Sequence, residues 1–546
     1  MVLYQQQNPR KLLNGFFGGI ILSLSFLTFY YHPLKLIIDA KMKLRNGSLS
    51  FDLWREPPYT VYLTVYIFNF TNHEAFERGE EHKLKVEEIG PFVYQEFLTN
   101  MDPHFYENGT LSYEPSRKLE FLPHLSIGNP EDIVINVPNL PLLGILSALD
   151  RSSMFLNLAV NQLTTFLNSQ PMLNLTVHEY LWGYDDPLIK LASNVLPSWI
   201  NFEKLGILDR MFDDGKNIVT INLDASIKPS KNPLLTDVER NRNYGIQLWN
   251  GSPGLSHWGY VEVNDTSQIT KHPANTRCNM IEGVYDGVIF PKPITHDTVF
   301  RVYRKAFCRT LPIVFDREGK SPDGLQAYFF KMREDAFDTP INNHDNECYC
   351  RHGRCLPRGL SDITPCYYGI PSANSQPHFY NSDPKLFERI EGLHPNKEDH
   401  DISIILHPQL GIPLWAKSRV QTNLVVRDTK YNAKTRPYNN IVLPVFWMQL
   451  SIEEIPHWMV LVIKFIEISP YIELTFAILL GIIGLSFIIT AVIRSIWIPE
   501  ITTHPEKPAG RKISSPTHST LHIDYSPVKI IPIQSKCAYF DRESNC

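Results

Sequence analysis

The sequence predicts an α+β membrane protein in which one large, mostly antiparallel β domain lies between two transmembrane helices. Three observations predict this class. Residues 12–31 and 474–493 carry no charged side chain, and each run is long enough to span a bilayer as a helix. Between them, runs of aromatic and β-branched residues alternate with turn signals. One internal segment instead has apolar residues at helical spacing.

The first apolar run follows a polar stub of residues 1–11 and could be either an uncleaved anchor or a signal peptide. Arg10 and Lys11 resemble the basic start of a signal peptide. However, the apolar run is longer than that of a typical signal peptide, and no small-x-small cleavage site follows it. We therefore expect residues 12–31 to remain as a transmembrane helix. The second helix is expected over 474–497, where Arg494 and Trp497 mark its end.

The segment between the two helices, residues 32–473, is expected to lie outside the cytosol, with both termini inside. Basic residues soon after the second span favour the cytosol for the tail of residues 498–546. The charges that flank the first span are ambiguous, because Lys35, Lys41, Lys43 and Arg45 outnumber Arg10 and Lys11. The Asn-x-Ser/Thr glycosylation signals decide the orientation. All lie within 32–473, at Asn46, Asn69, Asn108, Asn174, Asn250 and Asn264.

Six of the eight cysteines lie in the exterior segment, at Cys278, Cys308, Cys348, Cys350, Cys355 and Cys366. An even set in an oxidising compartment predicts three disulfides, for which 15 pairings are open. The alternative is a zinc site at Cys348, Cys350, His352 and Cys355. The single residue between Cys348 and Cys350 is a tighter spacing than structural zinc sites use. We therefore expect disulfides, with no metal and no cofactor.

The predicted strands of the exterior domain cover 59–70, 91–97, 217–223, 298–306, 325–332 and two runs within 402–426. A helical insertion is expected over 152–192. Its first helix covers 152–167, and its second, over 177–192, is broken at Pro187. Residues 455–469 are expected to form a last buried strand or an interfacial segment. The Pro- and Ser-rich tail of residues 498–546 is expected to be disordered.

Motifs for catalysis are missing from the sequence. No nucleophile elbow, His-Glu-x-x-His zinc motif, phosphate-binding loop or dinucleotide fingerprint occurs. Asp185 and Asp186 are adjacent, so on a helix they would not face each other, and with Pro187 they predict a helix end or turn. We therefore expect no enzyme. The net charge of −5 also argues against a nucleic-acid partner.

Several short motifs follow one another along the exterior domain. They include Glu-Ile-Gly-Pro-Phe-Val-Tyr at 88–94, Trp-Gly-Tyr-Asp-Asp-Pro at 182–187, Cys-Asn-Met-Ile-Glu-Gly at 278–283, Pro-His-Phe-Tyr at 377–380 and Glu-Gly-Leu-His-Pro at 391–395. In this order, with six cysteines and two flanking spans, the chain resembles the class B scavenger receptors. This is the family of platelet glycoprotein IV, lysosomal integral membrane protein and sensory neuron membrane protein.

The resemblance implies an antiparallel β-barrel with a helical bundle at its membrane-distal tip and an internal tunnel for lipids. It also implies the disulfides Cys278–Cys348, Cys308–Cys366 and Cys350–Cys355. The implied function is a receptor that binds lipids or lipoproteins and passes lipid through the tunnel to the membrane. Its ligand-binding tip would include Arg151, Phe155, Val160 and Leu163. The family often has lysines before this run, whereas this chain has Asp150 and Arg151.

Two other functions stay open: a lysosomal membrane receptor for a protein partner, without lipid transfer, and an ectoenzyme with two anchors. The expected location is the cell membrane or the endosomal or lysosomal membrane. Gly15 and Gly19 would suit helix pairing and a homo-oligomer. In the tail, Tyr525-Ser-Pro-Val fits a short endocytic sorting pattern. Cys537 and Cys546 lie too far beyond the bilayer to be expected sites of acylation.

Overall fold

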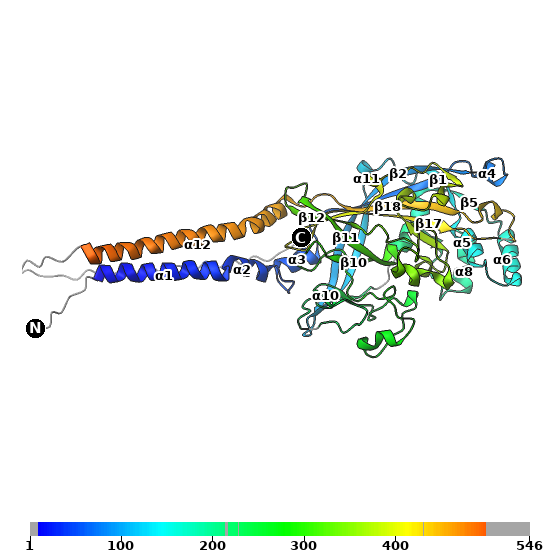
Figure 1. Ribbon diagram of the computed structural model, residues 1–546. Coiled ribbons are helices and arrows are strands. Elements are labelled where there is room, and N and C mark those ends of the chain that lie inside the picture. Colours follow the sequence, from blue (N-terminus) through cyan, green and yellow to red (C-terminus); the bar gives the residue numbers. More distant parts are fainter. Residues whose placement is uncertain (1–8, 213–216, 228, 430, 498–546) are drawn as a thin grey trace, which may run out of the picture. The chain divides into compact units, whose positions relative to one another are not determined.

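The computed structural model describes residues 9–497 except 213–216, 228 and 430 (Figure 1). The described residues fall into two compact units. The smaller contains residues 9–20 and 484–497, and the larger contains residues 21–483. The larger unit carries the whole exterior domain that the sequence predicts.

One large sheet forms the frame of the larger unit. Every pair along its path is antiparallel, in the order β10-β11-β12-β16-β17-β18-β1-β2-β3-β8-β9. The strands of this path are β1 (Val61–Phe70), β2 (Leu84–Phe105), β3 (Thr110–Phe121), β8 (Val219–Asn222), β9 (Ile246–Trp249), β10 (Val299–Arg304), β11 (Arg309–Lys320), β12 (Gln326–Met332), β16 (Ser403–Leu406), β17 (Pro413–Val425) and β18 (Val442–Ile452).

Shorter strands complete the β structure. β13 (Ser361–Asp362), β14 (Ser372–Ser375) and β15 (Ile390–Glu391) attach to the side of the main path. Two small separate sheets pair β4 (Val134–Pro138) with β5 (Met172–Thr176), and β6 (Tyr184–Asp185) with β7 (Lys204–Leu205). The α+β class and the predominantly antiparallel sheet are therefore confirmed.

The predicted strands over 59–70, 217–223, 298–306 and 325–332 correspond to β1, β8, β10 and β12, and 91–97 lies within the long β2. The two runs within 402–426 are β16 and β17. The sequence missed four strands of the path, which are β3, β9, β11 and β18. The last of them, β18, lies between β17 and β1. Pro444 lies inside this strand and argues against a central position. The fold accommodates it beside Asn423, where the β17–β18 register shifts.

The strands do not form a closed barrel, because β10 and β9 are the two ends of the path. A short segment at 283–285 hydrogen-bonds to both ends. Ile246 N donates to Val284 O at 2.8 Å on the β9 side, and Tyr285 N donates to Arg301 O at 2.8 Å on the β10 side. The ends of the path are therefore connected through this segment, and the barrel of the family resemblance stays a prediction.

A group of helices lies at the end of the larger unit opposite α3 (Leu49–Arg55) (Figure 1). They are α5 (Leu140–Ala148), α6 (Met154–Phe166), α7 (Val177–Trp182) and α8 (Pro187–Val195). The last three confirm the helical insertion predicted over 152–192, whereas α5 lies before it and was not predicted. The break before Pro187 is also confirmed. The Asp186 carboxylate caps α8 by accepting from Leu188 N at 2.8 Å and Ile189 N at 3.2 Å. This carboxylate is therefore a helix cap.

The remaining short helices connect the strands. The α-helices are α4 (His73–Glu77), α9 (Ile207–Phe212), α10 (Asp237–Arg240) and α11 (Lys397–His400). The 3-10 helices are η1 (Pro123–Leu125), η2 (Ser256–Trp258), η3 (Thr266–Lys271), η4 (Lys305–Phe307), η5 (His344–Tyr349), η6 (Arg351–Gly353), η7 (Thr364–Cys366), η8 (Pro377–Phe379), η9 (Pro384–Phe387) and η10 (Arg436–Tyr438).

Two long helices carry the apolar runs of the sequence, α1 (Pro9–Tyr31) and α12 (His457–Trp497), and α2 (Pro33–Lys41) follows α1. Each contains a segment long and apolar enough to cross a membrane, Leu13–Tyr31 and His457–Arg494. Of the two alternatives for residues 455–469, the buried strand was wrong, because α12 is already helical from His457. The interfacial segment stays a prediction. Val460 and Ile463, one turn apart, pack against Leu325 and Leu414 of the domain.

Within the larger unit, side-chain hydrogen bonds join the two terminal helical segments. Ser25 Oγ donates to Ala477 O at 2.7 Å, and Leu34 N donates to Glu473 Oε1 at 2.9 Å. In the smaller unit the close approach is at Gly18, where an added Cβ would lie 2.7 Å from Ile488 Cγ1. Gly19, which the sequence had singled out, has open space around its Cα.

Candidate functional site

A cavity of about 530 Å³ lies against the inner faces of the large sheet. Eight strands contribute to its wall: β1, β2, β3, β10, β11, β16, β17 and β18. Side chains two positions apart on a strand point to the same face, so each strand can present a series of apolar groups to the cavity. These residues are Val61, Leu63, Val302, Leu311, Ile313, Ile404, Val420, Met448, Leu450 and Ile452.

A few charged and polar side chains interrupt this apolar wall. Glu96 and Arg117, on β2 and β3, form an ion pair with Arg117 Nε 3.4 Å from Glu96 Oε1. Arg304 and Tyr59 line the same cavity. Burial raises the pKa of the Tyr59 phenol and lowers the pKa of the Arg304 guanidinium, because the protein around them disfavours the charged form of each.

A second, smaller cavity of about 80 Å³ lies next to the first. Its wall is almost wholly apolar and includes Leu140 at the start of α5, Leu205, Ile207, Ile370, Leu424 and Phe446. Met211, on α9, lines both cavities. Its flexible thioether side chain therefore lies in the wall between them, and a change of rotamer there would change how far the two spaces connect.

The residues predicted for the ligand-binding tip lie on α6 or just before it, and they divide into an exposed and a packed group. Phe155 is 83% exposed, Phe166 at the other end of the helix is also 83% exposed, and Arg151 is exposed just before it. Val160 and Leu163 instead pack against the buried Leu142, Leu146 and Leu188. The predicted stripe therefore holds α6 on the domain through its inner half and presents aromatic side chains on its outer half.

The negative charge of Asp150 is directed into the protein. Its carboxylate lies 2.9 Å from Arg354 Nη1 and 3.8 Å from Arg427 Nη1, and the side chain is only 10% exposed. The neighbouring Arg151 is exposed on the outside. Asp150 is therefore paired within the domain, and Arg151 is the exposed charge at this place.

The structure joins Cys278 to Cys348, Cys308 to Cys366, and Cys350 to Cys355. This is the pairing that the family resemblance implies. The alternative of a zinc site at Cys348, Cys350 and Cys355 was wrong, because oxidised sulfurs cannot act as thiolate ligands. The same reason excludes a metal between His257 and the nearby sulfurs of Cys308 and Cys366.

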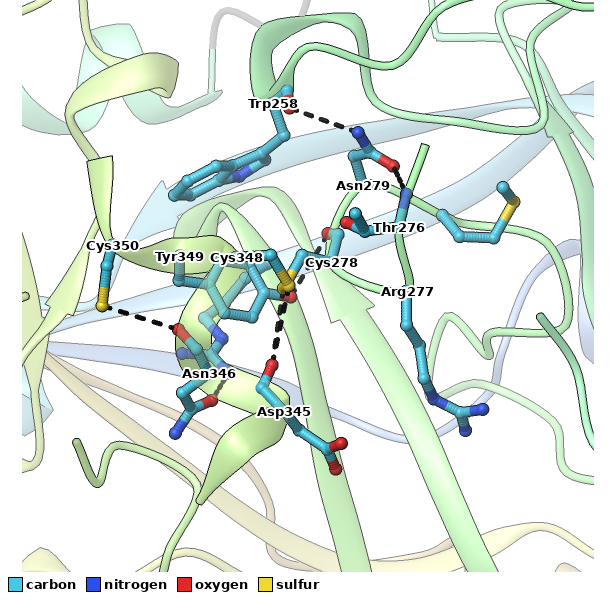
Figure 2. Close-up of a disulfide and its surroundings, with 12 residues drawn as sticks. Trp258, Thr276, Arg277, Cys278, Asn279, Asp345, Asn346, Cys348, Tyr349 and Cys350 are labelled. Carbon is cyan, nitrogen blue, oxygen red and sulfur yellow. Dashed lines mark hydrogen bonds between the residues drawn. A yellow bond between two sulfur atoms is a disulfide. The ribbon is translucent and has the colours of Figure 1, made fainter. Parts of the chain in front are cut away.

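Figure 2 shows the surroundings of the Cys278–Cys348 disulfide. Tyr349 donates its hydroxyl hydrogen to Cys278 O at 3.3 Å. The amide of Asn279, next to Cys278, donates to Trp258 O at 3.3 Å and accepts from Thr276 N at 2.9 Å. The Tyr349 hydrogen bond and the disulfide fix the loop around Cys278 to the 3-10 helix η5, and the Asn279 amide joins this loop to Trp258 of η2.

Of the predicted glycosylation sites, Asn46, Asn108, Asn174, Asn250 and Asn264 are exposed. Asn69 is half-buried, and its Oδ1 accepts from Asn136 N at 2.8 Å. The first eight residues and the tail from 498 onward, with Tyr525, Cys537 and Cys546, lie outside the described residues.

The sequence did not single out the cavity residues. Tyr59 and Arg304 both fall in predicted strands, but the strand of Arg304 also carries Arg301 and Lys305, so the charge alone did not distinguish Arg304. Met211 gave no signal, because its role depends on two cavities that meet only in the folded chain.

Comparison with known proteins identifies the family of this chain. The sequence profile of the CD36 family matches residues 15–495, nearly the whole chain. The chain belongs to the CD36 family. Scavenger receptor class B member 1 from Bos taurus is 28% identical to it over 441 residues, covering 80% of each chain. Lysosome membrane protein 2 from Homo sapiens is 31% identical over 418 residues, covering 76% of this chain and 79% of the relative.

Membership of the CD36 family confirms the resemblance found in the sequence. The two candidate spans at the ends of the chain and the disulfides agree with membrane-protein relatives. The names of these relatives describe a receptor and a membrane protein, which is consistent with the expected absence of an enzymatic function. A plasma or lysosomal membrane is consistent with the same relatives.

Proposed function

We propose that this member of the CD36 family is a lipid receptor that binds lipids or lipoprotein particles and passes lipid through its interior to the membrane. The observation that carries this proposal is the apolar cavity of about 530 Å³. Its volume falls within the range of about 300–1,000 Å³ that encloses small ligands. A relative at 28% identity is named a scavenger receptor.

An apolar interior suits transfer because water is the main barrier to lipid movement. Removing each methylene group from water is worth about 0.8 kcal/mol, so a lipid with a long acyl chain leaves a membrane or particle slowly. A chain that stays in contact with apolar side chains avoids most of this barrier. No energy source is required, since the lipid moves down its concentration gradient.

The topology proposed here has residues 32–473 outside the cytosol and both termini inside it. The exposed glycosylation signals and the three disulfides support this orientation. The membrane would be the plasma membrane or that of the lysosome. The domain limits that follow are a stub of residues 1–11, spans over 12–31 and 474–497, and a tail of residues 498–546.

The proposed route runs from the helical tip past Met211 into the large cavity. The smaller cavity includes Leu140 of α5, at the helical end, and shares Met211 with the larger one. The segment at 283–285, hydrogen-bonded to both ends of the sheet, supports a nearly closed wall around the route. The tunnel would form when the Met211 side chain moves aside.

The experiment is lipid transfer by the full chain reconstituted in liposomes. Donor particles carry a self-quenched fluorescent lipid, and arrival in the liposome membrane restores fluorescence. Met211→Trp places a larger, rigid side chain between the cavities and should reduce the transfer rate at least tenfold. Met101→Trp is the matched control, because Met101 is 46% exposed.

Equal transfer by wild type and Met211→Trp, with both proteins folded by thermal unfolding, would exclude the proposed route. Native mass spectrometry of the purified chain identifies lipids that remain bound. A chain that carries no lipid and extracts none from liposomes would contradict lipid transfer as a whole.

The second candidate function is a receptor for a protein partner on the lysosomal membrane, and the exposed face of α6 favours it. Phe155 and Phe166 are almost fully exposed, and large exposed aromatic side chains are frequent in protein interfaces. Phe155→Ser with Phe166→Ser should abolish partner binding while leaving lipid extraction from liposomes unchanged. Loss of both activities together would argue for lipid-particle capture at α6 instead.

A further inference from the structure

Arg304, the last residue of β10, presents an unusual charge to the large cavity. Its side chain is partly buried and lines the cavity together with Tyr59 and Gly287. A Cβ added to Gly287 would lie 3.5 Å from Arg304 Nη2 and 3.8 Å from Nε, so the guanidinium lies close to the backbone there. Gly287 has φ +85°, a conformation that favours glycine.

The carboxylates nearest to Arg304 are already engaged elsewhere. Glu96 forms its ion pair with Arg117. Asp286 accepts from the Tyr113 hydroxyl at 2.9 Å and from Val288 N at 2.9 Å. Glu96 and Asp286 act on Arg304 only through space, and among the described residues no carboxylate oxygen lies within ion-pair distance of its guanidinium.

An arginine in this position is costly without a partner. Burial lowers the pKa of Arg304, and the charge of Arg117 lowers it further, while Glu96, Asp286 and Tyr59 act in the opposite direction. A cation removed from water needs a counter-ion or several hydrogen bonds to offset its lost hydration. The described residues provide neither, so the cavity has unused capacity for an anion next to its apolar wall.

We infer that Arg304 selects the ligand of this cavity by pairing with the anionic head group, a carboxylate or a phosphate, of a lipid whose chain lies along the apolar wall. A guanidinium offers a planar fork of N–H donors that matches either group. Tyr59, whose phenol stays protonated, supplies a further donor. The acyl chain would contact Leu63, Ile313 and Met448. This inference rests on the proposed lipid-binding function and names its ligand class.

The first test needs no variant. The full chain in detergent is equilibrated with radiolabelled hexadecanoate, hexadecyl phosphate or 1-hexadecanol, and bound lipid is separated by size exclusion. The anionic probes should bind at least tenfold more tightly than the alcohol, which corresponds to about 1.4 kcal/mol. The order of hexadecanoate and hexadecyl phosphate shows whether the preferred head group is a carboxylate or a phosphate.

The second test compares Arg304→Gln and Arg304→Lys. Arg304→Gln should lower the preference for anionic probes to less than twofold while the affinity for 1-hexadecanol changes less than threefold. Arg304→Lys should keep part of the preference, because it keeps the charge. Without lipid, Arg304→Gln should unfold at the same or a higher temperature, since it removes a partly buried cation that has no counter-ion in the described part of the chain. A residue with only a structural role would instead lower that temperature.

A wild type that binds all three probes equally would overturn the inference and leave lipid binding in place. An unchanged preference in Arg304→Gln would also overturn it. Binding of none of the three probes would overturn both the inference and the proposed function.

Discussion

His400 is expected to make the stability of the receptor domain depend on pH. It is 5% exposed at the end of α11, and its ring stacks on that of His378 with centroids 4.5 Å apart. Its Nδ1 accepts from Asn396 N at 2.9 Å. Burial and then the charge of His378 lower the pKa of His400 to about 4, while Glu88 and Asp399 act in the opposite direction and Arg419 in the same one.

The direction in which stability changes with pH follows from the pKa values of His400 in the unfolded and the folded chain. In the unfolded chain a histidine has a pKa of 6.5. Between 6.5 and about 4 the unfolded chain therefore binds more protons at this site than the folded one, and the free energy of unfolding falls as the pH falls. The stabilisation is complete above pH 6.5 and is lost progressively toward pH 4.

The magnitude comes from the same difference. At about 1.36 kcal/mol per pKa unit, His400 contributes at most about 3 kcal/mol to the free energy of unfolding. About 2 kcal/mol of this contribution is lost between pH 7 and about pH 4.5. An entropy of unfolding near 2.1 cal/mol/K per residue gives about 0.9 kcal/mol/K for a domain of about 440 residues. The His400 contribution is therefore a shift of about 2–3 °C in the midpoint of thermal unfolding.

The assay is thermal unfolding of the full chain in detergent at pH 7 and near pH 4.5, followed by intrinsic fluorescence. His400→Gln keeps an acceptor near Asn396 N but does not titrate, so its midpoint should fall about 2–3 °C less between the two pH values than that of the wild type. His124→Gln, at an exposed position, is the matched control and should behave as the wild type. The same pH-dependent fall in wild type and His400→Gln would refute the reasoning.

Three further predictions concern the disulfides and the helices. Replacing Cys308 and Cys366, 58 residues apart, should lower the free energy of unfolding by about 4 kcal/mol, against about 2 kcal/mol for Cys350 and Cys355, 5 residues apart. Denaturant midpoints in the reverse order would contradict this ranking. Leu163→Ser should lower the free energy of unfolding by about 2–4 kcal/mol, because Leu163 packs against Leu142, Leu146 and Leu188. Phe155→Ser should change it by no more than about 0.5 kcal/mol, because Phe155 is exposed. Equal thermal midpoints for these two variants would show that α6 is not held by its inner face. Gly18→Leu should cost about 1–3 kcal/mol by overpacking against Ile488, and Gly19→Leu, in open space, should be neutral in the same measurement.

Local patterns along the chain determined much of the architecture. The charge-free runs 12–31 and 474–493 predicted the two spans, because the thickness of a bilayer sets a length that composition alone can satisfy. Runs of aromatic and β-branched residues predicted seven strands of the main path, namely β1, β2, β8, β10, β12, β16 and β17. Pro187 predicted the start of α8, since a proline fixes its own backbone and restricts the residue before it.

The sequence erred where a neighbour outside the local segment decides the conformation. Residues 455–469 have the composition of a strand, but Val460 and Ile463 pack on the domain from one face of a helix that continues into the second span. The helix-pairing face at Gly15 and Gly19 stays a prediction, while within the chain the position of Ile488 makes Gly18 the close contact.

The site itself was decided only by the tertiary structure. Trp447 and Glu88 are 359 positions apart, yet Trp447 Nε1 donates to Glu88 Oε2 at 2.6 Å. In the same way the cavity collects side chains from eight strands, and Arg304 matters only because Glu96 and Asp286 have other partners. The sequence alone therefore determined the membrane spans and the class of the fold, which depend on local composition and periodicity. The pairing order of the strands, the cavity and the charge inside it depend on contacts between residues far apart along the chain, and these form only when the chain folds.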